Sequence, residues 1–262
     1  MLVDDVVKYI REHRCYSHPV FVHWTKQDPS SDTIGALFHH IRSFCDSTRP
    51  GLNFPQGLRE LGLSEGSQLL AEIVESEEDH GPQLASMAGH IINRAARMDA
   101  CPDVYDQHAV EQKLKDCSDK ILGSLPGYDF KTGLMPQTKS AMAVFDRRRQ
   151  TDRESVYNNL GSALALEIIS NRHLIPSEKR CFIDSGLYSV SLDEPEMHYL
   201  LEHFGETGAE ARHEQNAIDA IAAAIDESNR AIIFGGAQAF LSKLVSLWDL
   251  LDSALLASGD RS

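Results

Sequence analysis

The sequence predicts an all-α protein, a compact bundle of seven to eight helices. Apolar residues recur at helical spacing along nearly the whole chain, and no convincing run alternates apolar and polar residues as a strand would. Pro and Gly gather at a few points that are typical of turns. A chain of 262 residues can bury one large core, so we expect a single helical domain over residues 1–262.

The expected helices follow from the apolar periodicity between these turns. They lie at about residues 2–14, 31–46, 64–98, 107–124, 137–173, 176–188, 193–228 and 234–256. Ser31 or Asp32 can cap the second of them and Ser64 the third. The breaks are expected at 47–55, 99–103 and 125–131 and at Ile175-Pro176.

Composition excludes several classes of protein. The formal net charge of −14 and the pI near 5.2 argue against nucleic-acid binding, which needs a basic surface. We find no signal peptide and expect no segment to span a membrane. The five cysteines are odd in number and form no Cys-x-x-Cys pair, as is typical of reduced thiols. We therefore expect a cytoplasmic protein with neither a nucleic acid nor a membrane as partner.

Two Glu-x-x-His pairs, Glu77–His80 and Glu210–His213, indicate the chemistry. The first lies in an apolar row with helical spacing, formed by Ile73, Glu77, His80, Leu84, Met87 and Ile91. A carboxylate and an imidazole buried side by side are unfavourable unless they pair or bind a metal. Carboxylates are hard ligands that can bridge two iron ions, and neutral imidazoles complete such sites.

Glu167 is a lone charge within the aliphatic segment 162–170. It shares a helical row with Val156, Leu160, Ala163 and Leu174, so it is expected to point inward. A buried carboxylate without a partner would be protonated, whereas one that bridges two metal ions would stay ionised. Pairing with Arg172 is the alternative.

The segment 193–228 supplies the largest group of candidate ligands. His203, Glu206, Glu210 and His213 lie on or beside one face of the expected helix. Gly205 and Gly208 leave room beside that face. Four potential metal ligands on one face are more than a structural core would use.

In order and spacing, these residues resemble the haem-oxygenase-like di-iron oxidases and oxygenases, relatives of the helical thiamin-salvage and quinone-cofactor biosynthesis proteins. The resemblance covers about residues 30–225. In that family one helix supplies Glu and His, the next a lone Glu, and a third a His-x3-Asp-x2-His cluster. Glu77–His80 resembles the first, Leu164-Ala-Leu-Glu167 the second, and the segment from His203 to His213 the third.

Two departures from the family pattern leave alternatives open. His203 stands seven residues before Glu210, which replaces the usual Asp, and Glu206 has the usual four-residue spacing. Either His203 or Glu206 is therefore the ligand. In the first helix, His90 or Glu78 could replace a partner chosen here.

The resemblance implies a haem-oxygenase-like fold, a metal-binding core at about 64–228 and an oxidoreductase that uses two Fe(II) ions per chain with dioxygen as co-substrate. The candidate ligands are Glu77, His80, Glu167, His203, Glu206, Glu210 and His213. It also implies a small-molecule substrate, with an amino acid or derivative in natural-product biosynthesis favoured by the acidic, soluble composition. Arg94, Arg172 and Arg180 are candidates to bind a substrate carboxylate, and a homodimer is left open.

Two other classes of function fit the same residues. In a cofactor-free enzyme on this fold, thiaminase-like or quinone-biosynthesis-like, the buried carboxylates would act as acid or base. A ferritin-like iron-binding protein would need two further helical glutamates beside the two Glu-x-x-His pairs. Only Glu167 is an obvious candidate there, and His203 would have no role.

Overall fold

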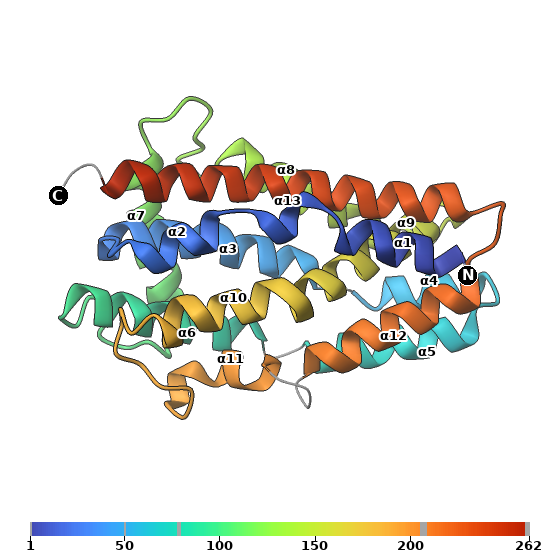
Figure 1. Ribbon diagram of the computed structural model, residues 1–262, viewed down its shortest axis with the longest axis horizontal. Helices are drawn as coiled ribbons and strands as arrows, with labels where there is room; N and C mark the ends of the chain where they lie inside the picture. Colours follow the sequence, from blue (N-terminus) through green and yellow to red (C-terminus); the bar gives the residue numbers. More distant parts are fainter. Residues whose placement is uncertain (1, 50, 78–79, 205–208, 260–262) are drawn as a thin grey trace.

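The computed structural model describes residues 2–49, 51–77, 80–204 and 209–259, and every regular element in these ranges is a helix. The nearest approach to a strand there is one isolated bridge between Asp129 and Leu134. The all-α prediction is confirmed. The helices form an elongated bundle with α13 along one side (Figure 1).

The α-helices are α1 Leu2–Arg11, α2 Val20–Lys26, α3 Ser31–Thr48, α4 Asn53–Glu60, α5 Ser64–Ser76, α6 His80–Ala96, α7 Gln107–Leu122, α8 Pro136–Met142, α9 Arg153–Ile169, α10 Ile175–Lys179, α11 His198–His203, α12 Ala209–Ala224 and α13 Arg230–Gly259. Short 3-10 helices are η1 Arg14–Ser17, η2 Ala143–Arg149 and η5 Pro195–Met197. Two π-helical turns are η3 Ser170–Leu174 and η4 Arg180–Asp184.

The packing places α9 at the centre of the bundle. It contacts α13 along one side and α12 along another, and most of its residues are buried on all faces. Helix α3 packs against α6 and α7, α12 lies beside α5, and α11 lies against α6 (Figure 1). The faces that carry Glu77, Glu167 and Glu210 therefore meet in the middle of the molecule.

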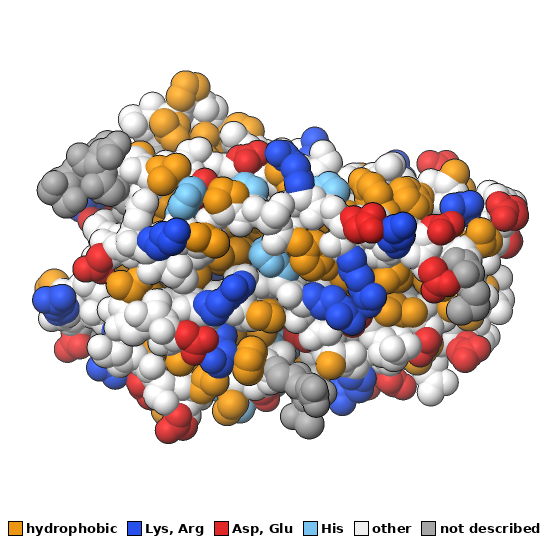
Figure 2. Space-filling model, viewed as in Figure 1, with side chains coloured by type: hydrophobic (Ala, Val, Ile, Leu, Met, Phe, Trp, Pro, Cys, Tyr) orange, Lys and Arg blue, Asp and Glu red, His pale blue; other side chains and the backbone are white. Residues whose placement is uncertain are grey.

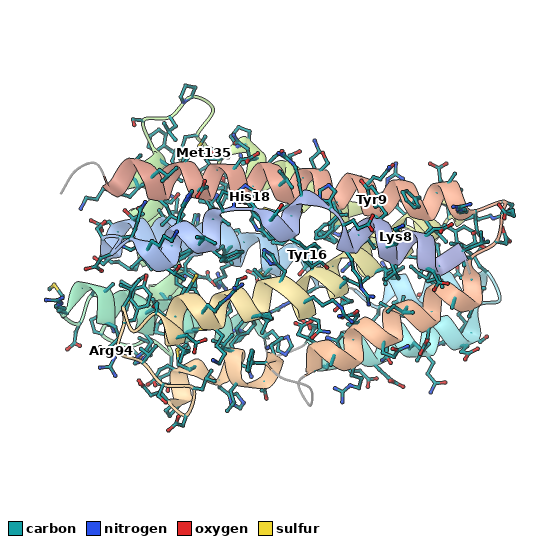
Figure 3. The ribbon with its side chains drawn as sticks, in the orientation of Figure 1. Lys8, Tyr9, Tyr16, His18, Arg94 and Met135 are labelled. Atoms are coloured by element: carbon teal, nitrogen blue, oxygen red, sulfur yellow. The ribbon has the colours of Figure 1, made fainter. Side chains whose placement is uncertain are left out.

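Polar contacts join α13 to the N-terminal segment. His18, which Figure 3 shows between α2 and α13, lies 3.0 Å from Asp249, and His23 lies 2.6 Å from Asp252. These histidines join the N-terminal segment to α13. On the outside, acidic, basic and apolar side chains are intermixed over the face in Figure 2.

Two glycines let α9 and α13 come into backbone contact. A Cβ on Gly161 would overlap the carbonyl oxygen of Ile233, and a Cβ on Gly236 would overlap that of Asn158. Helix backbones approach this closely only where side chains are absent. Because Glu167 lies less than two turns after Gly161, this contact also fixes the position of the Glu167 carboxyl group.

The expected helix 64–98 is two helices. Helix α5 ends at Ser76, Glu77 is its C-cap, and α6 begins at His80. Pro82 lies in the first turn of α6, where its missing N–H is not needed. Pro82 therefore fits the first turn of α6 without breaking the helix.

The expected helices 193–228 and 137–173 are also interrupted. Helix α11 ends at His203, and Phe204 is extended, with φ −90° and ψ 136°. Helix α12 then begins at Ala209, so His203 and Glu210 belong to different helices. Earlier in the chain, Gln150 is extended and Asp152 caps α9 by accepting a hydrogen bond from the Ser155 amide. The expected break at 47–55 is also short, because α4 begins at Asn53.

The break expected at Ile175-Pro176 is wrong. The chain stays helical from Arg153 to Asp184 through η3, α10 and η4. The amide of Ile175 donates to the carbonyl of Ser170, five residues back, so the ordinary i−4 pairing is already interrupted when Pro176 follows. The π turn thus accommodates the proline.

Helix α13 has the length and composition of a membrane span. A stretch of 18 residues within 230–257 has a mean hydropathy of 1.4, so by length and composition this helix could cross a bilayer, contrary to the expectation from the sequence. Half of that stretch is buried inside the protein, where α13 packs against α9, α8 and α2. A core helix of a soluble protein has the same composition, so this feature is weak evidence for a membrane.

The α9–α13 contact gives a prediction for stability. Gly161→Ala should destabilise the protein by about 1–3 kcal/mol, because the methyl group has no space. Gly235→Ala is the matched control: it lies in α13 with no atom within 4 Å of its added Cβ, and it should stabilise by up to about 1 kcal/mol. Urea unfolding followed by circular dichroism measures both changes. A Gly161→Ala variant as stable as wild type would contradict the close contact.

Candidate metal centre

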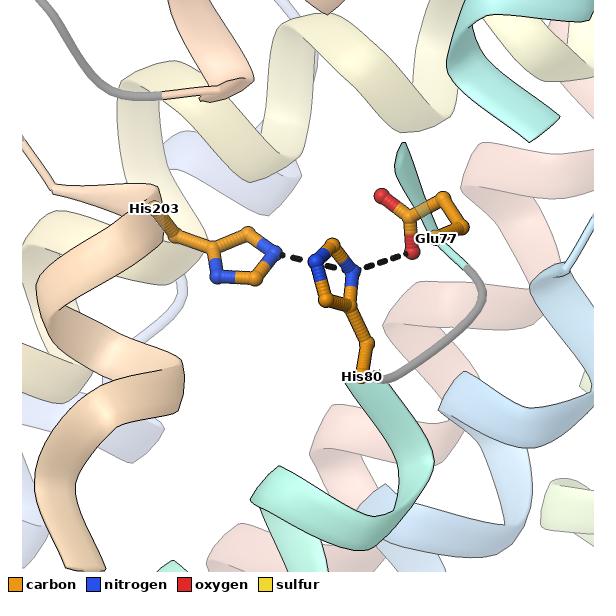
Figure 4. Close-up of side chains that lie close together, drawn as sticks. All are labelled: Glu77, His80 and His203. Carbon is orange, nitrogen blue, oxygen red and sulfur yellow. Dashed lines mark hydrogen bonds and ion pairs between the residues drawn. The ribbon is translucent and has the colours of Figure 1, made fainter. Parts of the chain in front are cut away.

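The first group of candidate ligands is Glu77, His80 and His203. They come from the end of α5, the start of α6 and the end of α11 (Figure 4). His80 Nδ1 lies 2.7 Å from Glu77 Oε2 and 3.2 Å from His203 Nε2. One ligand atom from each residue lies within 4.8 Å of the others, close enough to share one metal ion.

The second group is Glu167, Glu210 and His213, from α9 and α12. All three side chains are buried, and their ligand atoms also lie within 4.8 Å of one another. His213 Nδ1 lies 3.8 Å from Glu167 Oε2. The Glu-x-x-His spacing places Glu210 and His213 on the same face in the first turns of α12.

Hydrogen bonds orient two of the imidazoles toward the centre. His203 Nδ1 donates to the carbonyl of Tyr199 at 2.6 Å, which leaves the lone pair of Nε2 facing His80. Ser76 Oγ donates to the carbonyl of Ile73 and accepts from His213 Nε2 at 2.6 Å. The lone pair of His213 Nδ1 then faces the carboxylates. Metal-binding histidines are oriented in this way by their second nitrogen.

Glu77 and Glu210 join the two groups. Glu77 Oε1 lies 3.5 Å from His213 Nδ1 while its Oε2 contacts His80. Glu210 Oε1 lies 3.7 Å from His203 Nε2. The sequence predicts Glu167 as the bridging carboxylate, and in the structure the contacts between the two groups among the described residues come from Glu77 and Glu210.

Two buried ligand atoms have no hydrogen-bond partner in the described part of the chain. These are Glu210 Oε2 and His213 Nδ1. Buried polar atoms are rarely left unpaired, because burial removes the water that would otherwise satisfy them. A cation between these residues would satisfy both atoms, and the donor set of three carboxylates and three imidazoles fits iron.

The pKa values of the three carboxyl groups in the centre are shifted from their usual values. Burial, the charge of Glu77 and, to a smaller extent, Glu214 raise the pKa of Glu167 to about 8, against the opposing effect of Arg148. Burial and the charges of Glu167 and Glu77 raise the pKa of Glu210 well above its usual value. For Glu77, burial is outweighed by the His80 hydrogen bond and the nearby imidazoles, and the pKa is lowered.

The imidazoles are suited to bind a metal at neutral pH. Burial lowers the pKa of His213 to about 4, and burial and the neighbouring His80 lower that of His203. Both rings are therefore neutral near pH 7, as a metal ligand must be.

A cavity of about 50 Å³ adjoins the ligands, enough for a few water molecules or a diatomic gas. Its apolar wall is formed by Phe44, Leu84, Leu166 and Leu174. Tyr199, which the sequence analysis did not select, lines the same cavity with its ring centroid 4.4 Å from that of His203. The centre is therefore a small chamber, lined partly by these apolar side chains and partly by the ligands and other polar side chains.

Glu178 is a further buried carboxyl group that the sequence analysis missed. It is 1% exposed, its Oε2 has no partner among the described residues, and burial raises its pKa to about 8. Its charge is one of the causes that raise the pKa of Glu210 and of Tyr199. The sequence did not identify Glu178 because a break was predicted at Pro176, and a residue in a turn is expected to be exposed.

Several other candidates lie away from the centre. Arg172 binds Glu214 at 2.6 Å rather than Glu167, and His90 and Arg94 both bind Glu194. Figure 3 shows Arg94 beside α6, at the edge of the molecule. Arg180 donates to Ser177. Glu206 and Glu78 lie outside the described residues.

Comparison with known proteins identifies the fold. No protein-family model matches the chain, and no curated protein matches it. A crystal structure of a CADD-like protein of unknown function from Nostoc punctiforme superposes with a TM-score of 0.56, covering 96% of each chain at 15% sequence identity. At this identity the likeness shows a shared helical fold over nearly the whole chain.

The buried carboxyls predict how the metal-free protein responds to pH. A carboxyl whose pKa rises on folding stabilises the fold fully below its unfolded pKa of about 4.5, and this contribution is lost as the pH rises through the folded value. Metal-free wild type should therefore lose stability between about pH 5 and 8. Glu167→Gln should flatten the decline, by on the order of 1–3 kcal/mol at pH 8.

Urea unfolding with a chelator at several pH values measures this effect. Glu154→Gln, in the exposed first turn of the same helix, is the control and should leave the slope unchanged. An equal slope for Glu167→Gln and wild type would show that Glu167 is ionised in the metal-free fold.

Proposed function

We propose that this protein is a non-haem di-iron oxidoreductase that uses dioxygen to oxidise a small molecule. The observation that carries the proposal is the pair of three-residue groups joined by Glu77 and Glu210, with two imidazole lone pairs held toward them. A haem-oxygenase-like bundle with such ligands is the arrangement that the sequence resemblance implies.

The six candidate ligands would be shared between two Fe(II) ions. His80 and His203 would hold one Fe(II), His213 and Glu167 the other, and Glu77 and Glu210 lie where either carboxylate reaches both. When bound, the iron pair supplies the electrons and open coordination positions that reduction of dioxygen needs.

The remaining residues prepare the chamber for this chemistry. Phe44, Leu84 and Leu166 give the cavity beside the ligands an apolar wall, which lowers the local polarity and strengthens electrostatic interactions there. Tyr199 and Ser76 hold His203 and His213 in the neutral tautomers described above. Glu178 is a further buried carboxyl group, and burial raises its pKa to about 8, which keeps it protonated at neutral pH.

The substrate class that we favour is an amino acid or a derivative of one, oxidised in natural-product biosynthesis. All five cysteines are free in the fold, which fits a reducing, cytoplasmic setting. We expect no nucleic acid or membrane partner and leave a homodimer open.

One observation favours a second candidate. A carboxyl such as Glu167, with a pKa raised to about 8, suits acid–base catalysis without a cofactor. Such an enzyme would not explain why His203 and His213 are both held with lone pairs toward the carboxylates. A ferritin-like iron store would leave Tyr199 and the adjoining cavity without a role.

Iron binding is the first test. Anaerobic titration should show two Fe(II) equivalents per wild-type chain, and Glu77→Ala should lose both because this residue contacts both groups. Glu75→Ala, an exposed residue two positions earlier, is the control and should keep two. Binding of no iron by wild type, or unchanged stoichiometry in Glu77→Ala, would overturn the assignment.

Dioxygen uptake by the iron-loaded protein is the second test. His80→Ala and His213→Ala remove ligands from different ions, and each should reduce uptake roughly 100-fold or more, because ligands that act as a unit give non-additive losses. His198→Ala, an exposed residue of α11, should be unaffected. Uptake that survives in either ligand variant, or after exhaustive chelation of wild type, would favour the cofactor-free enzyme.

A further inference from the structure

A second, larger cavity adjoins the metal centre. Its volume is about 450 Å³, and it lies between the C-terminal end of α3 and helix η2. Asp46 and Arg49 line both this cavity and the smaller chamber, so the two spaces share a wall. Arg148, Ser47 and Asn53 add further hydrogen-bonding side chains to its lining.

Arg148 is a buried cation without a matching anion. It is 4% exposed, and no carboxylate of the described residues forms an ion pair with it within 4.0 Å. Its Nη1 donates to the carbonyl of Thr48, its guanidinium lies 4.5 Å from the Phe145 ring centroid, and its Nε has no partner in the described chain. A buried charge in this position is unfavourable unless a binding partner completes it.

Arg148 also lies near the ligands. Burial lowers its pKa to about 10, against the attraction of Glu167 and Glu77. Neither carboxylate forms an ion pair with Arg148 among the described residues. A group bound to Arg148 would lie in the cavity that shares Asp46 and Arg49 with the smaller chamber.

Arg49 faces the same cavity from the end of α3. Its guanidinium lies against Gly81, directly after His80, where a Cβ would overlap it. Its Nη2 is buried without a hydrogen bond in the part of the chain that the structure describes, and its nearest acidic atom, Asp46 Oδ1, lies 3.8 Å away. Arg49 therefore has donor capacity left at the wall between the two cavities.

Neutralising the ligand carboxylates does not require these arginines once iron is bound. Glu77, Glu167 and Glu210 together carry less negative charge than two Fe(II) ions carry positive charge. Two Fe(II) ions with these three carboxylates leave one positive charge, and the larger cavity adds one more, because Arg49, Arg148 and Arg149 line it together with Asp46 and Asp146. An anionic ligand in the larger cavity offsets this positive charge.

We propose that Arg49 and Arg148 bind the carboxylate of the substrate in the cavity between α3 and η2, with the rest of the molecule directed at the chamber beside His80. Planar guanidinium groups suit this task, because each can donate two parallel hydrogen bonds to a carboxylate. The inference rests on the proposed function and names its substrate class as a carboxylic acid, amino acids included. Arg94, Arg172 and Arg180, selected from the sequence, are engaged elsewhere.

Binding of hexanoate tests the proposal, with hexanamide as the uncharged probe of equal length. Isothermal titration is run on metal-free protein and on protein with Fe(II) added under nitrogen. Wild type should bind hexanoate in at least one form, and Arg49→Gln and Arg148→Gln should each weaken binding roughly 10- to 100-fold. Hexanamide should bind at least about tenfold more weakly than hexanoate.

Arg147→Gln is the matched control. It removes the same charge from the same short helix, but its side chain is about half exposed and does not line the cavity. It should bind hexanoate as wild type does. If Arg148→Gln does not fold, Arg49→Gln decides, because that side chain is about a third exposed and its loss leaves the core intact.

Absence of hexanoate binding in both forms, equal binding by Arg49→Gln and wild type, or equal binding of hexanamide would overturn the inference. Iron equivalents counted on the same samples separate it from the proposed function. Two Fe(II) bound without arginine-dependent hexanoate binding refutes the substrate site alone. Arginine-dependent hexanoate binding without iron refutes the di-iron proposal and leaves the carboxylate site standing.

Discussion

The gathering of three carboxyl groups around His213, two buried and one partly exposed, is the constraint on which the centre of this fold depends. In a medium with little water, neighbouring carboxylates repel one another strongly unless a positive charge lies between them. Glu167 and Glu210 respond by holding protons, whereas Glu77 stays ionised through its contact with His80. The fold therefore keeps a group of ligands in an unfavourable state that a pair of divalent cations would relieve.

The helix ends explain how these residues come together. Glu77 caps the end of α5 and His80 begins α6, while His203 ends α11 and Glu210 lies in the first turn of α12. The amino ends of α6 and α12 present partial positive charge to the carboxylates, which stabilises them. Only Glu167 and His213 come from helix interiors. Breaking two long helices at the centre thus brings more ligands to one point than continuous helices would.

The sequence predicted burial well, because burial at each position follows from local periodicity. His80, Glu167, Glu210 and His213 are all buried where the apolar rows placed them, and the all-α fold is confirmed. The helix ends were not predictable in this way. Spacings of three and seven residues fit a continuous helix as well as they fit a pair of helix ends, and the choice depends on tertiary packing.

The dependence on tertiary packing also explains why the sequence did not identify Arg49 and Arg148 as binding residues. Arg49 lies in the segment 47–55, which reads as a solvated turn, and the run 147–149 reads as a solvated charged face. Only the packing of η2 against the end of α3 turns Arg148 inward, while Arg147 and Arg149 stay exposed. Charge identifies such residues as candidates, but burial separates a binding group from a surface charge, and burial here comes from another part of the chain.

The continuous helical segment from Arg153 to Asp184 shows why one buried carboxyl differs from the rest. The π turn at 170–174 begins three residues after Glu167, brings Ser170 and Leu174 to the wall of the chamber, and is followed by Glu178. Such turns are frequent at functional sites, because the extra residue redirects the side chains that follow. Glu178 contacts none of the imidazoles by an ion pair in the described structure, and burial alone keeps it protonated. The fold therefore holds two kinds of carboxyl group: three placed among imidazoles to carry charge when cations bind, and Glu178, placed apart from them, which burial keeps protonated.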